Sequence, residues 1–295
     1  MDKQKLLGAL FVLLGAISYG ILATIVKYAN GLGIPISSLT FFQFFIGFVI
    51  LVLIRIFSKP AMKPSLSSLV KLLAWGASLG VTTTLYYLSI QYIPVSVGII
   101  LLMQSIWISL LLEAIITKQM PAMKKTIGAL LCIVGTLLAT KIFGTAVTLD
   151  WRGVGLGIGA GLSYTISIYS SSSIEKQHPN YIRSLYLVAG GLIVISIFWN
   201  LKIIENISVP SLSWGALLAL FGTVIPPLLF TVGIPKTGIG IGSILSAIEI
   251  PVSIFSAFII LQEQVTAMQW FGVLIIVFSV VVVNINPTKK PAKTL

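Results

Sequence analysis

Charged residues are scarce in this chain. Asp, Glu, Lys and Arg make up 9% of its 295 residues, and only seven of these are acidic. A soluble domain carries about a quarter charged residues. With 57% apolar residues, a water-soluble fold of this length would have too little polar surface to cover itself. The scarcity of charge therefore excludes a soluble globular protein and indicates a chain surrounded mostly by lipid.

Cysteine and histidine are almost absent, with one residue of each, Cys132 and His178. A single cysteine excludes a disulfide framework, and a single histidine can form neither a metal cluster nor a Ser–His pair at membrane depth. The GVGLGIGAG stretch at 153–161 is superficially like a nucleotide-binding loop, but no soluble βαβ unit surrounds it. We therefore expect no enzymatic activity, no cofactor, no metal and no use of ATP.

Long apolar runs dominate what remains. A spanning helix needs roughly 20 mostly apolar residues, and turn residues such as Asn30-Gly31 and Pro179-Asn180 separate ten such runs. The runs cover residues 6–29, 36–57, 68–91, 94–117, 125–143, 152–173, 181–200, 212–234, 237–261 and 266–285. We expect ten transmembrane helices, short loops and a cytoplasmic tail at 286–295.

Basic residues are distributed unevenly over the loops. With ten spans, fifteen of the 19 Lys and Arg residues fall on one side of the membrane, and the other side holds Lys27, Lys141, Arg152 and Lys202. Because Lys and Arg mark the cytoplasmic side, we expect both termini in the cytoplasm and the protein in the cytoplasmic (inner) membrane. The same rule, with anionic lipid as a secondary partner, explains the net charge of +12. The basic residues form no compact face for a nucleic acid.

The two halves of the chain can be aligned with each other. The matches, at offsets of 145 and 144 residues, are Gly8–Gly153, Ser18–Ser163, Tyr19–Tyr164, Ser67–Ser211, Gly98–Gly242 and Gly128–Gly272. An odd number of spans in each half turns the second half upside down, and many secondary transporters consist of inverted repeats. We expect a first repeat over 1–143 and a second, inverted repeat over 152–285.

Three longer stretches carry a family pattern: GAISYGILATIVKYA (15–29), LYYLSIQYIPVSVGIILLMQS (85–105) and ILSAIEIPVSIFSAFIILQEQVTAMQWFGVLIIV (244–277). The chain resembles the drug/metabolite transporter superfamily, in particular its ten-helix EamA-type members. In that family an acidic residue typically precedes by nine positions a Gly that opens the last helix of a repeat. Glu263 and Gly272 keep this spacing, whereas Gln119 precedes Gly128.

The resemblance implies an all-α integral membrane fold, with two inverted five-helix repeats around a central cavity. It also implies export of amino acids, related metabolites or drugs.

Glu249 is the one charged residue between Thr237 and Gln262. It belongs to a stripe of small and polar residues at helical spacing, formed with Gly242, Ser246, Ser253 and Ser256. Bulky residues occupy the opposite side, so we expect the stripe to face the bundle interior. There Glu249, Ser246 and Ser253 would line the cavity.

An acid at membrane depth costs about 2.5–3.5 kcal/mol and is usually functional. Glu249 would be protonated when closed off and ionised when hydrated, so it could exchange a proton or meet a cationic amine. The alternative is a protonated carboxyl that only hydrogen-bonds a carbonyl. Pro251 cannot donate to the carbonyl of Ala247, which we expect to leave a polar acceptor nearby.

Other candidates come from the same reasoning. In the first repeat, Ser105 corresponds to Glu249, and Gln104 and Trp107 beside it could present hydrogen-bonding and stacking surfaces. Tyr19 and Tyr164 are equivalent in the two halves and could line the cavity or make interhelical hydrogen bonds.

Three further residues are candidates for the cavity wall. Tyr87 extends a stripe of small residues, and Gln43 lies within the aromatic run FFQFF. Lys27 could hold a substrate carboxylate, but snorkelling to the outer interface is the simpler explanation. Glu113 is expected to pair with a loop lysine such as Lys118.

The leading interpretation is a secondary transporter that exports small organic metabolites by alternating access. Proton coupling, an uncoupled facilitator and an importer all stay open. A lipid scramblase, an intramembrane enzyme and a channel rank lower, because each needs features that the sequence does not offer. Zwitterionic or weakly cationic amphipathic solutes suit the expected cavity. Whether the protein is a monomer or a homodimer stays open.

Overall fold

The structure of the protein is a computed structural model that describes residues 3–59, 63–93, 95–139, 150–204, 207–262 and 264–284. These residues are almost entirely helical and contain no strand. In chain order the helices are α1 (Lys3–Gly31), α2 (Ile36–Phe57), α3 (Leu66–Tyr92), α4 (Val95–Leu102), α5 (Ser105–Thr117), α6 (Met123–Ala139), α7 (Trp151–Ser173), α8 (Asn180–Trp199), α9 (Leu201–Ile204), α10 (Val209–Leu218), the π-helix η1 (Ala219–Val224), α11 (Ile225–Thr237), α12 (Ile239–Ser246), α13 (Glu249–Ile260) and α14 (Ala267–Asn284).

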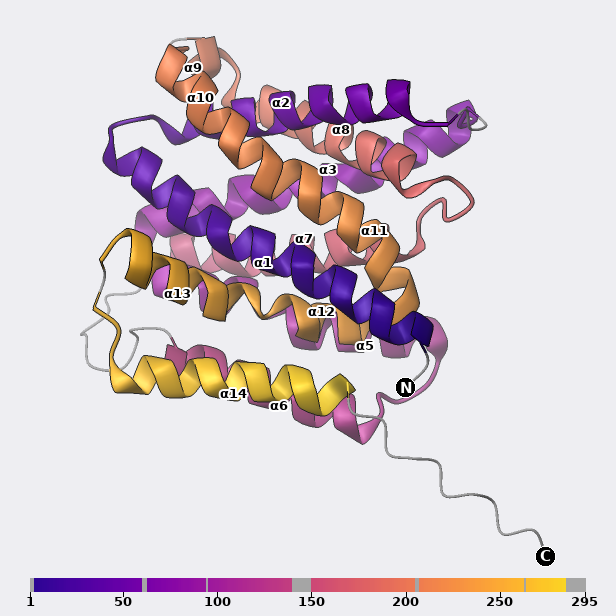
Figure 1. The fold of residues 1–295 in the computed structure, drawn as a ribbon, viewed down its shortest axis with the longest axis vertical. Helices are drawn as coiled ribbons and strands as arrows, with labels where there is room; N and C mark the ends of the chain where they lie inside the picture. Colours follow the sequence, from indigo (N-terminus) through magenta and orange to yellow (C-terminus); the bar gives the residue numbers. More distant parts are fainter. Residues whose placement is uncertain are drawn as a thin grey trace, which may run out of the picture.

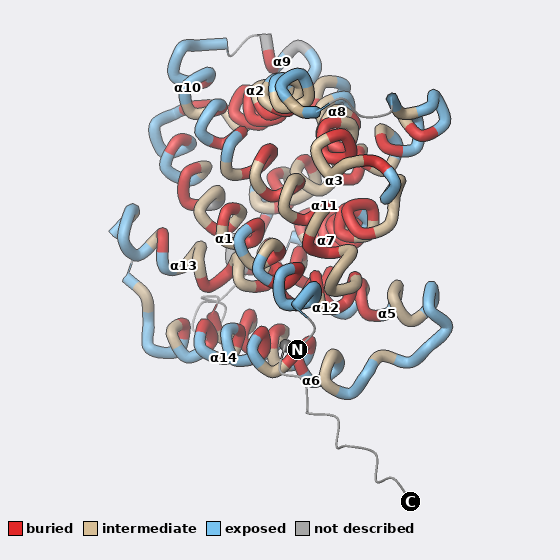
Figure 2. The backbone as a smooth tube through the Cα atoms, turned by 45° about the vertical axis from the view of Figure 1, so that its right-hand side comes forward, coloured by how far each residue is buried: buried red, intermediate tan, exposed pale blue. Residues whose placement is uncertain are grey.

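Seven segments of the described chain are long and apolar enough to cross a membrane. Large apolar side chains cover the outside of the bundle, for example Phe57, Ile197 and Leu274. Buried positions gather toward its centre (Figure 2). A lipid solvent requires such a bundle: its exterior is apolar, and α-helices pair their backbone polar groups internally.

Most of the expected apolar runs coincide with one continuous helix, such as 36–57 with α2. The runs 94–117 and 237–261, however, are each divided in two, into α4 and α5 and into α12 and α13. The run 212–234 passes through the π-helix η1 between α10 and α11. Glu263, residues 140–143 and the tail at 286–295 lie outside the described residues.

The two divided runs break at corresponding places. Val95 and Ile239, which begin α4 and α12, are 144 residues apart, and so are Ser105 and Glu249, which begin α5 and α13. This is the offset at which the two halves of the sequence match. The main irregularity of the helices therefore follows the repeat.

Small residues set the closest helix crossings. A Cβ on Gly8 of α1 would lie 3.0 Å from the carbonyl of Gly233 on α11, and one on Gly233 would lie 2.7 Å from the carbonyl of Gly8. At the corresponding crossing of α7 and α3, the hydroxyl of Ser89 donates to the carbonyl of Gly153 at 2.7 Å. Close backbone approach through small residues is the usual way in which membrane helices pack.

The chain connections fall on two opposite sides of the bundle (Figure 1). The start of α1, the end of α14, and the α2–α3 and α7–α8 connections lie on the right side of that view. The α1–α2 and α13–α14 connections lie on the left side. In the text below, these are the terminal side and the opposite side.

Candidate functional site

The break between α12 and α13 immediately precedes Glu249. Pro251 has no N–H to donate to the carbonyl of Ala247, and that carbonyl instead accepts from the N–H of Ile250 at 3.1 Å. We expected this carbonyl to be free, so the structure corrects that point. The chain takes a tight turn of 3₁₀ type, which in mid-helix often marks a functional hinge.

The break between α4 and α5 has a different cause. The side-chain amide of Gln104 donates through Nε2 to the carbonyl of Ile100 at 2.9 Å. The backbone N–H of Gln104 turns to the carbonyl of Leu101, at 3.2 Å. The carbonyl of Ile100 therefore accepts from a side chain, whereas in a regular helix it would accept from the backbone N–H of Gln104.

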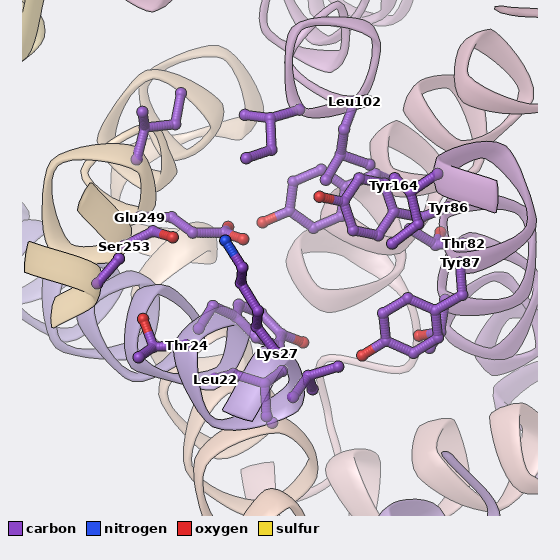
Figure 3. A pocket seen from close by; sticks show the side chains of 18 of the residues that line it. Leu22, Thr24, Lys27, Thr82, Tyr86, Tyr87, Leu102, Tyr164, Glu249 and Ser253 are labelled. Carbon is purple, nitrogen blue, oxygen red and sulfur yellow. The ribbon is translucent and has the colours of Figure 1, made fainter. Parts of the chain in front are cut away.

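Between these helices the protein encloses a cavity of about 720 Å³. Tyr19 of α1, Tyr86 and Tyr87 of α3, and Tyr164 of α7 line it together with Glu249. Figure 3 shows these side chains around one open space. Phenol rings offer apolar faces with a polar tip, so the cavity can accept a solute that is partly apolar.

Glu249 and Lys27 supply the charges of this cavity. Among the described residues that line it, Glu249 is the only acid and Lys27 the only base. The Lys27 side chain extends from α1 into the same space as Glu249 (Figure 3). Lys27 therefore lines the cavity, whereas snorkelling to the outer interface was the simpler expectation from the sequence.

Gly20 brings α1 against the turn that carries Glu249. A Cβ at Gly20 would lie 2.7 Å from the carbonyl of Glu249 and 2.6 Å from Cβ of Val252. One turn further, the hydroxyls of Thr24 and Ser256 are 2.5 Å apart. The contact between α1 and α13 therefore positions the turn from which the Glu249 side chain extends into the cavity.

Seven of the ten predicted site residues line the cavity: Glu249, Ser253, Tyr19, Tyr164, Tyr87, Gln43 and Lys27. The other three do not. Ser246 is buried and donates to the carbonyl of Ser243 at 2.8 Å. Trp107 is 41% exposed, and its indole N–H donates to Oε1 of Gln104 at 2.7 Å, away from the cavity.

Gln104 and Trp107 were predicted to face the solute because they flank the counterpart of Glu249. The structure corrects this placement. The Gln104 side chain bonds the carbonyl of Ile100 at the helix break, and Trp107 donates to that side chain.

Several residues that line the cavity were not predicted from the sequence. Tyr86, Thr82, Thr223 and Gln269 line the cavity but are not among the site residues predicted from the sequence. Thr83 belongs to the same helical stripe as Tyr87, but no helical spacing leads to Thr223. Thr223 belongs to the π-helix η1, in which side chains point in other directions than in an α-helix. No residue pattern predicts that turn.

The cavity reaches the opposite side of the bundle. Its lining includes Asn30 near the end of α1, Ile90 near the end of α3, and Gln264 between α13 and α14. Asn30 and Gln264 are exposed. Figure 1 places these helix ends away from the start of α1. Solute could therefore enter from the opposite side.

The terminal side is closed by buried polar contacts. Arg183 of α8 is 3% exposed and donates to the carbonyls of Thr231 at 2.9 Å, Ser171 at 2.6 Å and Ile174 at 2.9 Å. It thus joins the end of α7 to α8 and α11. A cation at a helix C-terminus is also favoured by the helix dipole.

Two ion pairs reinforce the same side. Lys125 Nζ lies 2.7 Å from Glu113 Oε2, so Lys125 and not Lys118 is the partner of Glu113. Lys71 Nζ of α3 lies 3.7 Å from Oε1 of Glu175 in the α7–α8 loop. A hydrogen bond with Ser68 and the charge of Lys71 hold the pKa of the Glu175 carboxyl below its ordinary value.

A helical membrane-spanning bundle with a charged, aromatic cavity that reaches one side defines the class of small-solute transporters. The sequence profile of the EamA-like transporter family matches residues 6–141 and again residues 151–285. The chain belongs to the EamA-like transporter family, within the drug/metabolite transporter superfamily.

Two known proteins are similar to this chain, one in sequence and one in fold. A Synechocystis protein described as an uncharacterized transporter is 25% identical over 207 residues, which are 68% of this chain. The match spans 62% of that protein's length. A chain in a solved crystal structure shares the fold, with a TM-score of 0.74 and 15% identity over 95% of this chain and 97% of that one.

Proposed function

We propose that this membrane transporter moves small zwitterionic or weakly cationic organic solutes, such as amino acids and related metabolites, by alternating access. The observation that carries the proposal is the cavity of about 720 Å³, with Glu249 at a helix break and an opening toward one side. Discontinuous helices near the midplane are typical of transporter binding sites.

In this proposal the protein has ten spans in two inverted repeats, residues 1–143 and 152–285. Two observations support it: the paired helix breaks 144 residues apart, and the two crossings of α1 with α11 and of α7 with α3. In the alternate state the terminal side would open and the opposite side would close, as the two halves exchange conformations.

In this proposal the protein lies in the cytoplasmic (inner) membrane, and its terminal side faces the cytoplasm. The basic residues support this, since Lys59, Lys71, Lys125 and Lys176 lie in or next to connections of that side. The open cavity would then face outward, and export would release the solute there. Thermodynamics permits import by the same path.

Glu249 is the residue on which transport depends in this proposal. An ionised carboxylate would hold a solute ammonium, and protonation would release it, which couples transport to pH if protons share the path. Replacement by Gln keeps the size and removes the charge. Because a hydrogen bond to a charged group contributes about 1.5–3 kcal/mol, flux of an amine substrate should fall at least about tenfold.

The test is uptake of a labelled panel of amino acids and amines into proteoliposomes, with and without a pH gradient. Glu249→Gln should lose flux and any pH dependence. Asp150→Asn is the matched control, because Asp150 is exposed and only accepts from the N–H of Arg152 at the start of α7, as Asn also would. Unchanged flux and pH dependence in Glu249→Gln would refute the role. Lipid exchange without solute flux would favour a scramblase instead.

A further inference from the structure

Three buried residues on the wall of the cavity carry an oxygen without a partner in the described part of the protein: Gln43, Thr223 and Tyr164. The first two lie together, where α2 meets η1. Gln43 of α2 is 3% exposed and Thr223 of η1 is 1% exposed, and both line the cavity. No described residue hydrogen-bonds Oε1 of Gln43 or Oγ1 of Thr223. Buried polar atoms are almost always paired, and one left unpaired is costly. Because both residues line the cavity, a solute group that enters their contact is the partner that we consider for these two oxygens.

Two glycines leave room for these side chains at the contact between α2 and η1. A Cβ on Gly222 would lie 2.5 Å from Nε2 of Gln43, so only glycine lets the amide rest against η1. A Cβ on Gly47 of α2 would lie 2.7 Å from Cβ of Thr223. The pair is thus built into a close helix contact and is not a chance exposure of polar atoms.

The π-helix contributes to the same arrangement. A single π-helical turn is uncommon and is frequently found at functional sites. Here the hydroxyl of Ser18 on α1 donates to the carbonyl of Phe221 in η1 at 2.6 Å. That bond ties the turn carrying Thr223 to the helix that carries Tyr19 and Lys27.

The corresponding positions of the other half are apolar. At the 144-residue offset that relates Ile36, the start of α2, to Asn180, the start of α8, Gln43 corresponds to Leu187 and Thr223 to Leu79. Leucine therefore satisfies the packing of this helix contact in the second copy. The fold does not require the polar pair, which points to recognition of a ligand.

We propose that Gln43 and Thr223 form a second recognition subsite, which hydrogen-bonds a neutral hydroxyl or amide group of the solute. The proposal rests on the transport function above and adds a specificity-determining pair to it. An amide and a hydroxyl can both donate and accept, which suits neutral groups. A charged group would lose its hydration here without a counter-charge, and Glu249 and Lys27 are the charged residues of the cavity.

The experiment compares probes of equal shape that differ in this one group. The pairs are L-threonine with L-valine, L-asparagine with L-leucine, and ethanolamine with n-propylamine. Two readouts are used: inhibition of flux in proteoliposomes, and thermal stabilisation of the purified full-length protein by each probe. The wild type should prefer the hydroxyl or amide member by about 3- to 10-fold, the usual effect of one hydrogen bond.

Three variants should lose this preference without losing the apolar probes. Gln43→Leu copies Leu187 of the other half, Thr223→Val replaces the hydroxyl by a methyl group, and Gly222→Ala should displace the Gln43 amide. Thr82→Val is the control, since Thr82 lines the same cavity but its hydroxyl already donates to the carbonyl of Ser78 at 2.7 Å. If Gln43→Leu does not fold, the other two variants carry the test.

A wild type that binds both members of each pair equally would overturn the subsite, as would variants that keep the preference. That result would mean that the two side chains do not contact the solute. Absence of flux for every probe would refute the transport function, whereas the thermal readout would still decide on the subsite.

Discussion

Gly20 illustrates how much depends on a single missing methyl group. Its substitution by Ala would place Cβ 2.7 Å from the Glu249 carbonyl, in the contact between α1 and α13. Overpacking of this kind costs typically about 1–3 kcal/mol. We expect Gly20→Ala to lower the thermal unfolding midpoint in detergent and to reduce solute binding.

The matched control is Gly155→Ala on α7, where an added Cβ meets nothing within 4 Å. There alanine should be neutral or slightly stabilising, because it is the better helix former. Equal unfolding midpoints for the two variants would contradict the proposed fit between α1 and the Glu249 turn.

Residue patterns could predict Glu249 and several other lining residues, but not which of them meet across helices. A lone acid in an apolar run has few explanations other than function, so Glu249 was visible in the sequence. Thr223 and Gln43 are 180 residues apart and meet only because α2 packs against η1. Trp107 was misplaced because the side-chain bond of Gln104 changes the helix that carries both residues.

At the scale of elements, apolar runs predicted where helices lie but not how they are divided. The run 237–261 was expected as one helix, and the residue that divides it, Pro251, was recognised. Its effect was not, because the freed carbonyl of Ala247 found the N–H of Ile250. Hydropathy and spacing describe side chains, whereas this turn depends on which backbone groups remain to be paired.

The tight turn before Glu249 leads to a prediction about Pro251. Alanine in its place would restore an N–H for the Ala247 carbonyl and favour one continuous helix. We expect Pro251→Ala to raise the unfolding midpoint and to slow transport, because Glu249 would turn away from its present position. Pro210→Ala is the control, since Pro210 lies in the first turn of α10, where no helical bond is lost. Faster transport in Pro251→Ala would refute a hinge at this turn.

For the whole molecule, the two sides differ in what holds them together. On the terminal side, Arg183 binds carbonyls of α7 and α11. Its counterpart on the opposite side, at the 144-residue offset, is Leu39, which cannot make such bonds. The corresponding helix ends on that side border the open cavity. This difference between the two halves biases the protein toward closure of the terminal side.

Removal of the Arg183 contacts should shift that balance. In Arg183→Gln the amide can replace only part of the guanidinium bonds, so we expect the terminal side to open more often. The measurement is labelling of Ile234→Cys, a position 1% exposed on α11, by an impermeant maleimide from the terminal side. Replacement of Cys132 by Ser leaves this as the single cysteine. Labelling should be slow with Arg183 present and several-fold faster without it, whereas the exposed Arg152→Gln should have no effect. Equal labelling in all three backgrounds would mean that Arg183 stabilises the fold without controlling access to the cavity.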